Sequence, residues 1–483
     1  MAERAGVTSS LGGLIGRAVD VRKGEAAALI WSSAYFLLIL TSYYILRPIR
    51  DDMGAAGGVE NLAWLFTGTL VGMMLIHPLF TSLVARFPRQ KFVPLIYRFF
   101  ILNLIIFFLV FRGANEAQAV WAARVFFIWV SVFNLFVVSV FWSFMTDVYR
   151  PEQSKRLFGV LAVGGTIGAI IGASITSVFV EQLGRVNLLL VSALFLEVAC
   201  RAAGRLDREE AKLAAVNAAE GQGASVAARH PSLADTLSGP IPRGAAAGDG
   251  NQGREVIGGG TLDGIRDVLR SRYLLGIAGL MLFFTISSTF LYFQQAEITR
   301  QVFGDDSAGR TRFFALIDLT VNVLTLVTQL FITGRLMKWL GVGASLAFLP
   351  LISVLGFGVL AVAPVLTALV VLQVLRRAGN FAIQRPAREV LYTVLPRTDK
   401  YKSKNFNDTF VYRVGDQIGA WSFAFIMAKL GLGIAGVSMT MVPFSAVWLL
   451  LAIWLGWKYR AIQERRLTPP GASPAAVPVA ETS

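Results

Sequence analysis

The chain has 483 residues, of which 55% are hydrophobic and 16% charged, and its formal net charge is +15. It is more apolar than a soluble core requires, and this predicts a protein that crosses the membrane many times. The single cysteine, Cys200, excludes an intrachain disulfide, and two distant histidines, His77 and His230, argue against a histidine metal site. We therefore expect no metal and no cofactor.

Apolar runs of about 20 residues predict about twelve transmembrane helices. They lie near residues 26–46, 62–85, 91–111, 119–146, 157–180, 186–201, 274–298, 311–335, 342–362, 365–385, 409–430 and 434–457. The expected fold class is an all-α polytopic membrane protein made of two six-helix halves.

The predicted domains follow from these runs. Two six-helix bundles, 26–201 and 274–457, are separated by a cytoplasmic linker, 202–273, that is rich in Ala, Gly, Arg and Glu and is expected to be mostly disordered. A cytoplasmic N-terminal segment, 1–25, and a tail, 458–483, complete the chain.

Lysine and arginine are concentrated in the short loops on one side of the predicted helices, and this bias places that side in the cytoplasm. Both termini are then cytoplasmic, and the expected location is a bacterial inner membrane. Because topology explains the basic charge, we expect a lipid bilayer and a small molecule as partners and no nucleic acid.

Glycines recur in both halves. Gly164, Gly168 and Gly172 are spaced four residues apart on the fifth predicted helix, which allows two helix backbones to approach closely. A similar segment, 415–420, occurs in the eleventh helix. Together with the six-plus-six layout it favours two parallel repeats around a central path, as in the major facilitator superfamily.

The tenth predicted helix carries a polar stripe. Gln373, Arg377, Asn380 and Gln384 share one face of a straight α-helix, with Arg376 beside them. An unpaired charge near mid-membrane costs about 2.5–3.5 kcal/mol even on the mildest scale. We expect Arg376 and Arg377 to bind the negative charge of a substrate, and Asn380 and Gln384 to orient it.

The eighth predicted helix has a matching stripe that includes Asp318 and Asn322. Asp318 is expected to pair with Arg377, to compensate charge or to carry a proton. The stripes then line a water-filled substrate path, or they hold a buried ion pair that only fixes helix register.

A charged hinge between the first two helices predicts an outer gate. Tyr43, Arg47 and Arg50 share one helical face, followed by Asp51 and, beyond a glycine-rich turn, Glu60. Glu297, at the outer end of the seventh helix, falls at the matching place in the second half and is a further gate candidate.

Three further sites are candidates. Tyr292 lies on the polar face of the seventh helix and is expected to contact substrate. Arg124, near the start of the fourth helix, lines the path or merely extends towards the membrane surface. Arg413 and Asp416, at the cytoplasmic end of the eleventh helix, form an inner gate or are simply solvated.

Several of these segments resemble the ATP/ADP translocase family of bacteria and plastids. They are 43–51 (YYILRPIRD), 21–25, 389–392, 400–404 and 412–416. The resemblance implies a fold like that of the major facilitator superfamily and nucleotide exchange across a membrane. The chain is similar especially to bacterial relatives of that family whose substrates are undefined. Family exchangers carry a lysine shortly after the glutamate that Glu60 resembles, whereas residues 63–67 here contain none, which removes one phosphate partner.

The sequence thus predicts a secondary transporter that moves an organic anion, first of all a nucleotide such as ATP or ADP, by alternating access. Two alternatives stay open: a proton-coupled exporter of another small molecule or lipid, and a non-transporting membrane scaffold or sensor. An enzyme is not expected, because the sequence shows no nucleophile–base or metal constellation.

Overall fold

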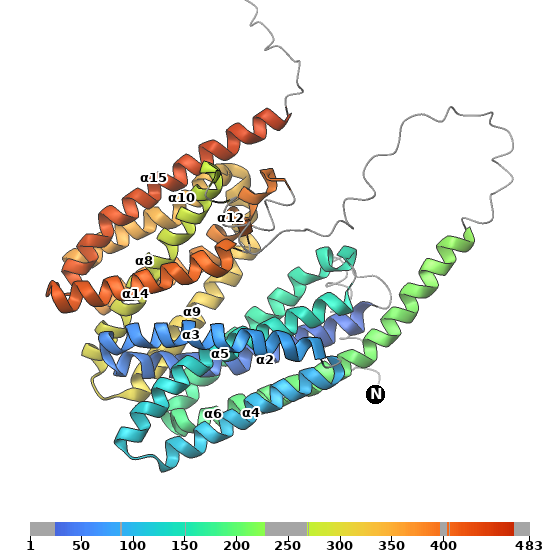
Figure 1. The fold of residues 1–483 in the computed structure, drawn as a ribbon, viewed down its shortest axis with the longest axis horizontal. Coiled ribbons are helices and arrows are strands. Elements are labelled where there is room, and N and C mark those ends of the chain that lie inside the picture. The colour runs from blue at the N-terminus through green and yellow to red at the C-terminus, as the bar shows by residue number, and fades with distance from the viewer. Residues whose placement is uncertain are drawn as a thin grey trace, which may run out of the picture. The chain divides into compact units, whose positions relative to one another are not determined.

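The computed structural model describes residues 25–86, 89–149, 151–227, 268, 270–396, 403–404 and 406–467. All the elements assigned to these residues are helical (Figure 1). The predicted N-terminal segment, most of the predicted linker and the end of the predicted tail lie outside the described residues.

Among the described residues, the first half of the chain contains five long helices, and the second half combines long helices with several short helical segments. In the first half these are α2 (Glu25–Ala56), α3 (Gly58–Arg86), α4 (Arg89–Gly113), α5 (Glu116–Val148) and α6 (Pro151–Ala227). In the second half they are α8 (Arg272–Phe303), α9 (Ser307–Phe331), α10 (Thr333–Val362), α11 (Leu366–Gly379), η2 (Asn380–Gln384), α12 (Arg385–Leu391), η3 (Tyr392–Val394), η4 (Asn407–Val411), α14 (Tyr412–Lys429) and α15 (Ile434–Leu467).

The predicted fold class is confirmed, since every predicted span lies on helical residues. Ten helices among the described residues are long and apolar enough to cross a membrane. One of them, α6, contains two predicted spans joined at Gly184, whose φ of 75° interrupts the helix. The eleventh predicted span corresponds to α14, which carries three charged residues.

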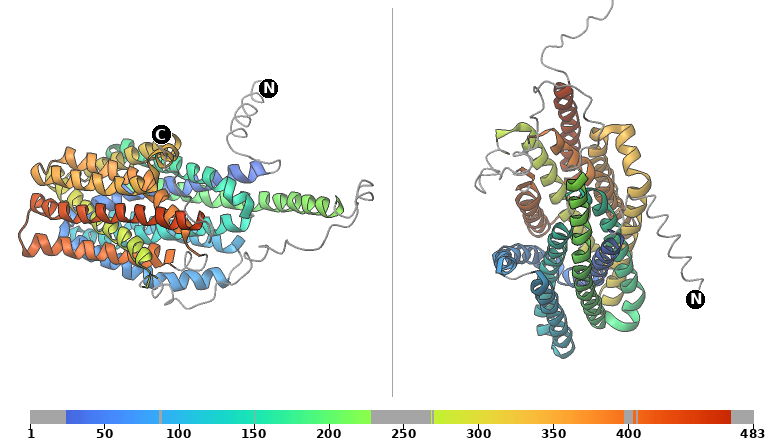
Figure 2. Two further views of the ribbon diagram at one scale, coloured as in Figure 1. Left: turned by 90° about the horizontal axis from the view of Figure 1, so that it is seen from above. Right: turned by 90° about the vertical axis from the view of Figure 1, so that its right-hand side faces the viewer.

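Helix α6 also extends further than the predicted span. It continues to Ala227 and projects beyond the other helices of its unit (Figure 2, left). Residues 202–227 are rich in Ala, Glu, Leu and Arg, which are good helix formers. The beginning of the predicted linker is therefore helical, while 228–267 lie outside the described residues.

The chain forms two compact units. Unit 1 holds most of the first half together with Asp305–Leu319, and unit 2 holds most of the second half together with Ala55–Thr67. The first residues of α9 thus belong with the first half, and the first residues of α3 belong with the second. The predicted bundle boundaries, 26–201 and 274–457, stay a prediction.

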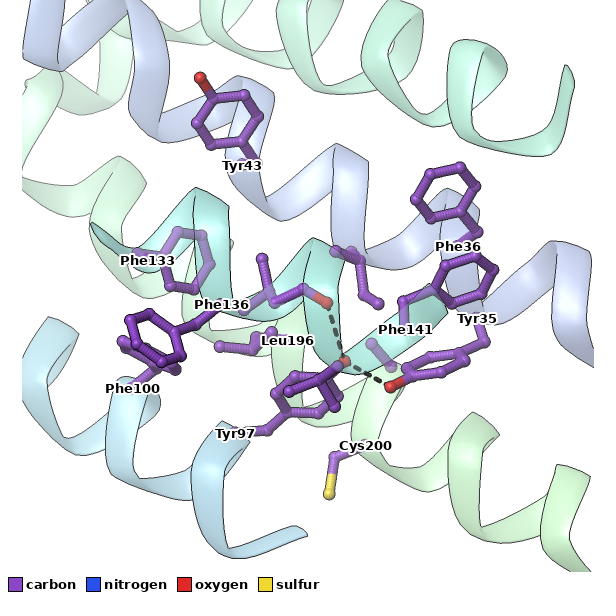
Figure 3. Close-up of a cluster of buried hydrophobic side chains, with 14 of the residues drawn as sticks. Tyr35, Phe36, Tyr43, Tyr97, Phe100, Phe133, Phe136, Phe141, Leu196 and Cys200 are labelled. Carbon is purple, nitrogen blue, oxygen red and sulfur yellow. Dashed lines mark hydrogen bonds between the residues drawn. The ribbon is translucent and has the colours of Figure 1, made fainter. Parts of the chain in front are cut away.

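The core of unit 1 is built from aromatic rings (Figure 3). Phe36 stacks on Phe141 with ring centroids 4.1 Å apart. The hydroxyl groups of Tyr35 and Tyr97 are hydrogen-bonded to each other, and Tyr97 also donates to the Val137 carbonyl at 3.5 Å. Buried tyrosines need such partners because an unpaired hydroxyl in an apolar core is costly.

Close glycine contacts join equivalent helices in each unit, which confirms the predicted packing. In unit 1, a Cβ at Gly168 would overlap the carbonyl oxygen of Leu37, and the Thr41 hydroxyl donates to the Gly168 carbonyl at 3.1 Å. In unit 2, a Cβ at Gly419 would lie 2.8 Å from the Cβ of Thr289. Each first helix of a half therefore packs directly against a glycine face of the fifth.

Unit 2 is organised around two helix pairs. Helices α10 and α15 run side by side (Figure 1), with Gly343 and Gly456 in backbone contact. Helix α8 packs against α14 and also against α15. Helix α8 thus lies between α14 and α15, and it carries several of the polar contacts described next.

Candidate substrate site

Three of the charged residues predicted for the outer gate, Arg47, Arg50 and Asp51, come together in unit 1 with Asp318, which was predicted for the substrate site, whereas Glu60 and Glu297 belong to unit 2. Arg47 Nε lies 3.6 Å from Asp318 Oδ2 and 3.9 Å from Asp51 Oδ2. Arg50 Nη2 lies 3.2 Å from Asp51 Oδ1, and its guanidinium stacks over the Phe127 ring at 4.5 Å. Two cations and two carboxylates therefore share one partly buried cluster.

The predicted partner of Asp318 was Arg377, whereas the partner seen within unit 1 is Arg47. Asp318 belongs to the part of α9 that lies in unit 1, and Arg377 belongs to unit 2. Pairing between Asp318 and Arg377 thus stays a prediction, as does pairing of Glu297 with Arg47 or Arg50.

Two aromatic contacts surround predicted residues of unit 1. Tyr43 is buried against Tyr44, with ring centroids 5.3 Å apart and the rings nearly perpendicular. Arg124 stacks over the Trp121 ring at 4.7 Å, within the first part of α5. This position fits either of the two roles expected for Arg124.

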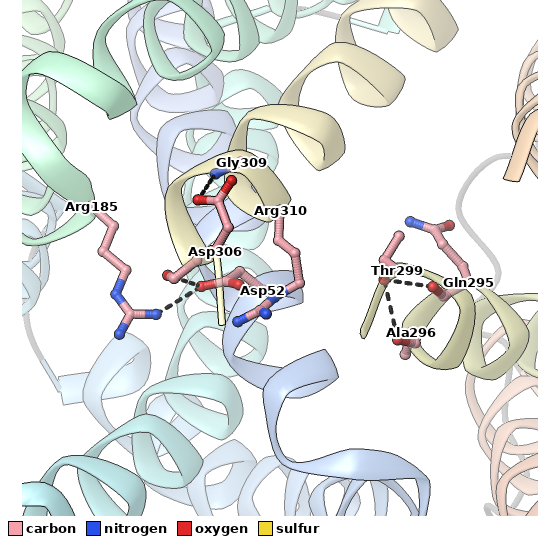
Figure 4. Close-up of polar contacts among 9 residues, drawn as sticks. Asp52, Arg185, Gln295, Ala296, Thr299, Asp306, Gly309 and Arg310 are labelled. Atoms are coloured by element: carbon pink, nitrogen blue, oxygen red, sulfur yellow. Dashed lines mark hydrogen bonds and ion pairs between the residues drawn. The ribbon is translucent and has the colours of Figure 1, made fainter. Parts of the chain in front are cut away.

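Unit 1 contains a second charged cluster, the Asp52 cluster, which the sequence analysis did not predict (Figure 4). It consists of Asp52, Arg185, Ser307 and Arg310. The Asp52 carboxylate is fully buried and accepts hydrogen bonds from Arg185 Nη1 at 2.7 Å, from Ser307 Oγ at 2.8 Å and from Arg310 Nε at 2.7 Å. Arg310 is itself 4% exposed.

The Asp52 cluster joins distant parts of the sequence. Asp52 comes from α2, Arg185 follows the interruption of α6 at Gly184, and the other two residues form the first turn of α9. In the sequence, Asp52 is marked only by its place beside Asp51 in the charged last part of an apolar helix. Three donors on one carboxylate hold the start of α9 against the first half of the chain.

Unit 2 contains a buried cation with neutral partners. Arg376 is 3% exposed and donates to the Ser287 carbonyl at 3.2 Å, the Ser287 hydroxyl at 2.7 Å and the Ser288 hydroxyl at 3.3 Å. Its guanidinium also lies 5.6 Å from the centroid of Phe357 and 5.9 Å from that of Trp448. Within the described part of the chain Arg376 forms no ion pair, so its charge is solvated by hydroxyls, a carbonyl and aromatic faces.

The remaining polar residues of the tenth predicted span lie along the same helical segment. Gln373 Nε2 donates to Gln295 Oε1 at 2.5 Å, and Arg377 is partly buried. The π-helical segment η2 begins at Asn380 and ends at Gln384, which is 2% exposed.

The π-helical segment corrects one expectation. The predicted polar face assumed a straight α-helix, but a π turn contains an extra residue and shifts later residues by about one position around the axis. Gln384 therefore does not continue the face of Gln373 and Arg377 in the way that α-helical spacing requires.

Other predicted residues of unit 2 lie on α3, α8 and α9. Tyr292 contacts Phe66 with ring centroids 5.7 Å apart, and Asn322 is 8% exposed. Glu60 is exposed in the first turn of α3. Glu297 accepts from Arg300 Nη2 at 2.8 Å, so its partner within the unit comes from its own helix.

The two charged residues of the predicted inner gate, Arg413 and Asp416, lie next to α8. Arg413 Nη1 lies 3.5 Å from Asp416 Oδ2, and the Thr289 hydroxyl donates to Asp416 Oδ1 at 3.4 Å. At the next residue, the side chain of Gln417 accepts from the Thr67 hydroxyl at 3.0 Å. Helix α14 is thus tied to α8 and to the start of α3 through polar contacts.

Together these contacts gather charged and amide side chains on α8, α11 and α14. In the part of the chain that the structure describes, no group of three or more His, Cys, Asp or Glu side chains could hold a metal ion.

The fold is similar to several solved transporters. A bacterial homologue of the human lysosomal transporter Spinster is 14% identical, with a TM-score of 0.54, and the match covers 93% of this chain and 100% of that one. The POT family transporter PepTSo is 13% identical, with a TM-score of 0.58, covering 91% and 99%. The nucleoside transporter NupG is 12% identical, with a TM-score of 0.52, covering 92% and 100%.

At these identities the structures establish the fold alone, and no curated protein matches the sequence. The family model described as Major Facilitator Superfamily matches residues 10–387, which is most of the chain. With the all-helical, two-unit fold, this match shows that the chain belongs to the major facilitator superfamily of secondary transporters.

Proposed function

We propose that this transporter carries a small organic anion by alternating access, and that a nucleotide is the first candidate. The fold does not choose the substrate, because the similar structures include nucleoside, peptide and other transporters. We choose an anion because the arginine buried on α11, Arg376, has only neutral partners within the described part of unit 2.

The observation that carries the proposal is the environment of Arg376. The Arg376 guanidinium is solvated by neutral groups, two hydroxyls and a carbonyl, and has no counter-charge among the described residues. An anion that enters unit 2 next to α11 is therefore stabilised, while a cation is repelled.

Arg376 and Arg377 have different places in this proposal. Arg376 is enclosed between α8, α10 and α15, so it acts through its field and not by contact in this conformation. Arg377 is only partly buried, and an arginine fork is suited to bidentate contact with phosphate or carboxylate. Asn380 and Gln384 follow on the same helical segment and would orient the solute.

The resemblance to ATP/ADP translocases makes nucleotides the first compounds to test. The segment at 63–67 lacks the family lysine, so phosphate recognition here would depend on arginines. Tyr292, which is partly buried beside Phe66, could stack on a base.

The test is counter-exchange of labelled ADP in proteoliposomes of the purified protein, loaded with ATP, with ADP or with buffer alone. Saturable uptake that requires internal nucleotide would support the proposal. Arg377→Gln should abolish this uptake, while Arg201→Gln, which changes an arginine exposed on α6, should leave it intact.

Two results would count against the proposal. Uptake that is unchanged in Arg377→Gln would remove this residue from the binding site. Folded wild-type protein that exchanges neither nucleotides nor other organic phosphates and carboxylates would remove anions as the substrate class.

A further inference from the structure

The helical segment that carries the proposed site has an internal break in its backbone hydrogen bonding. In the π-helical segment η2, the N–H of Arg385 donates to the carbonyl of Asn380, five residues earlier. The next residue is Pro386, which lies inside the continuous helical run and has no N–H to donate. The carbonyls four and five residues before it, those of Ala382 and Phe381, receive nothing from position 386.

Both carbonyls are satisfied by side chains from other helices. The Thr333 hydroxyl, at the start of α10, donates to the Ala382 carbonyl at 2.7 Å. Gln329 Nε2, near the end of α9, donates to the Phe381 carbonyl at 3.2 Å. An unsatisfied carbonyl is costly inside a membrane. These two side chains therefore supply the one hydrogen bond that Pro386 cannot donate and a second bond at the neighbouring carbonyl.

The segment η2, whose carbonyls accept these two side-chain hydrogen bonds, belongs to the proposed binding site. It begins three residues after Arg377, and it contains both Asn380 and Gln384. Gln384 is 2% exposed, and its Oε1 atom has no hydrogen-bond partner among the described residues. A π turn in a membrane helix often occurs at a functional site, and its width decides which way the residues after it face.

We propose that Thr333 and Gln329 are positioning residues. By bonding the carbonyls of Ala382 and Phe381, one of which lacks a backbone donor because of Pro386, they hold η2 in its π-helical form and thereby fix the orientation of Gln384 relative to Arg377. The inference rests on the proposed function only in taking α11 and η2 as part of the substrate site.

The test is a double-mutant cycle between Thr333 and Pro386. Thr333→Val keeps the side-chain shape but removes the hydroxyl, and Pro386→Ala restores a backbone N–H. Each variant is made in a protein in which Cys200 is replaced by Ala and Gln384 by Cys, and the rate of maleimide labelling at position 384 is measured. This readout reports the orientation of position 384 and needs no substrate.

We expect slow labelling when Thr333 and Pro386 are both present. Thr333→Val should speed labelling by about tenfold, the equivalent of one lost hydrogen bond to a buried group, and Thr333→Ser should return it to the slow rate. In the Pro386→Ala background the same Thr333→Val change should alter the rate by no more than about twofold. Thr367→Val, at an exposed threonine of α11, is the matched control and should change nothing.

An equal effect of Thr333→Val in both backgrounds would overturn the inference, because the hydroxyl would then act independently of the proline. Unchanged labelling combined with a lower melting temperature would also overturn it, since Thr333 would be structural only. With Gln384 intact, labelled ADP uptake should show a raised KM in Thr333→Val with a smaller change in kcat. Failure of wild-type ADP uptake would count against the proposed function, whereas the labelling cycle would still decide the role of Thr333.

Discussion

The buried and partly buried arginines of unit 1 and Arg376 of unit 2 have different kinds of partner. In unit 1, Asp52 accepts from two arginines, and Arg47 lies within 4 Å of two carboxylates, Asp51 and Asp318. In unit 2, Arg376 is as buried as Arg310 but contacts only hydroxyls, a carbonyl and aromatic rings within the described residues. Paired charge fixes a structure, whereas unpaired charge is available to a ligand.

The largest effect is expected in the Asp52 cluster. Asp52→Asn leaves Arg310 buried without its carboxylate, and breaking a buried pair by removing one partner costs about 3–5 kcal/mol in the free energy of unfolding. Denaturant unfolding in detergent micelles would measure this loss.

The matched control is Glu181→Gln, because Glu181 and Arg312 form an ion pair in the same unit with both side chains about half exposed. An exposed pair is worth about 0–1 kcal/mol. Equal losses for Asp52→Asn and Glu181→Gln would contradict the structural role of the Asp52 cluster.

The next largest effect concerns packing, in which the two units are alike. Gly168→Ala and Gly419→Ala each place a Cβ against a neighbouring helix, and overpacking of this kind costs about 1–3 kcal/mol. Gly159→Ala, where a Cβ would meet nothing within 4 Å, should be neutral or stabilising. Melting temperatures of the three variants would measure these changes in stability. If only one of Gly168→Ala and Gly419→Ala were destabilising, the two units would not share the same glycine packing.

A smaller effect is expected for Asp318→Asn. Arg47 would keep Asp51 as a carboxylate partner, so the loss should be about 1–2 kcal/mol, less than for Asp52→Asn. Denaturant unfolding in detergent micelles would measure the loss in the free energy of unfolding for Asp318→Asn. A loss as large as that of Asp52→Asn would mean that Arg47 depends on Asp318 alone.

The smallest effect on stability is expected for Arg376→Gln. Lost hydrogen bonds to Ser287 and Ser288 are offset by removing a buried charge, so the change should be about 1 kcal/mol or less. A loss of several kcal/mol would show that Arg376 is a structural clamp between α11 and α8.

Much of the fold could be predicted because long apolar runs and glycine spacing are local signals. The span at 157–180 and the glycines within it predicted a closely packed helix, and the structure pairs it with α2. The grouping of Arg47, Arg50 and Asp51 also followed from spacing on one helix.

The rest depends on contacts that no local pattern encodes. Asp52 finds partners 133 to 258 residues away, and neither Arg185 nor Arg310 is marked by its neighbours in the sequence. Pro386 predicts a disturbed helix, but the π turn and its capping by Thr333 depend on where α10 begins. Side-chain periodicity assumes regular helices, and for this reason it misplaced Gln384.

The most direct test of anion recognition compares ADP with adenosine in the same proteoliposomes. The unpaired charge on α11 predicts that unlabelled ADP competes for labelled ADP uptake far better than adenosine does, by about tenfold or more. Arg376→Gln should reduce that preference while the protein stays folded. Equal competition by ADP and adenosine, or a preference that survives Arg376→Gln unchanged, would contradict the role assigned to the buried charge of unit 2.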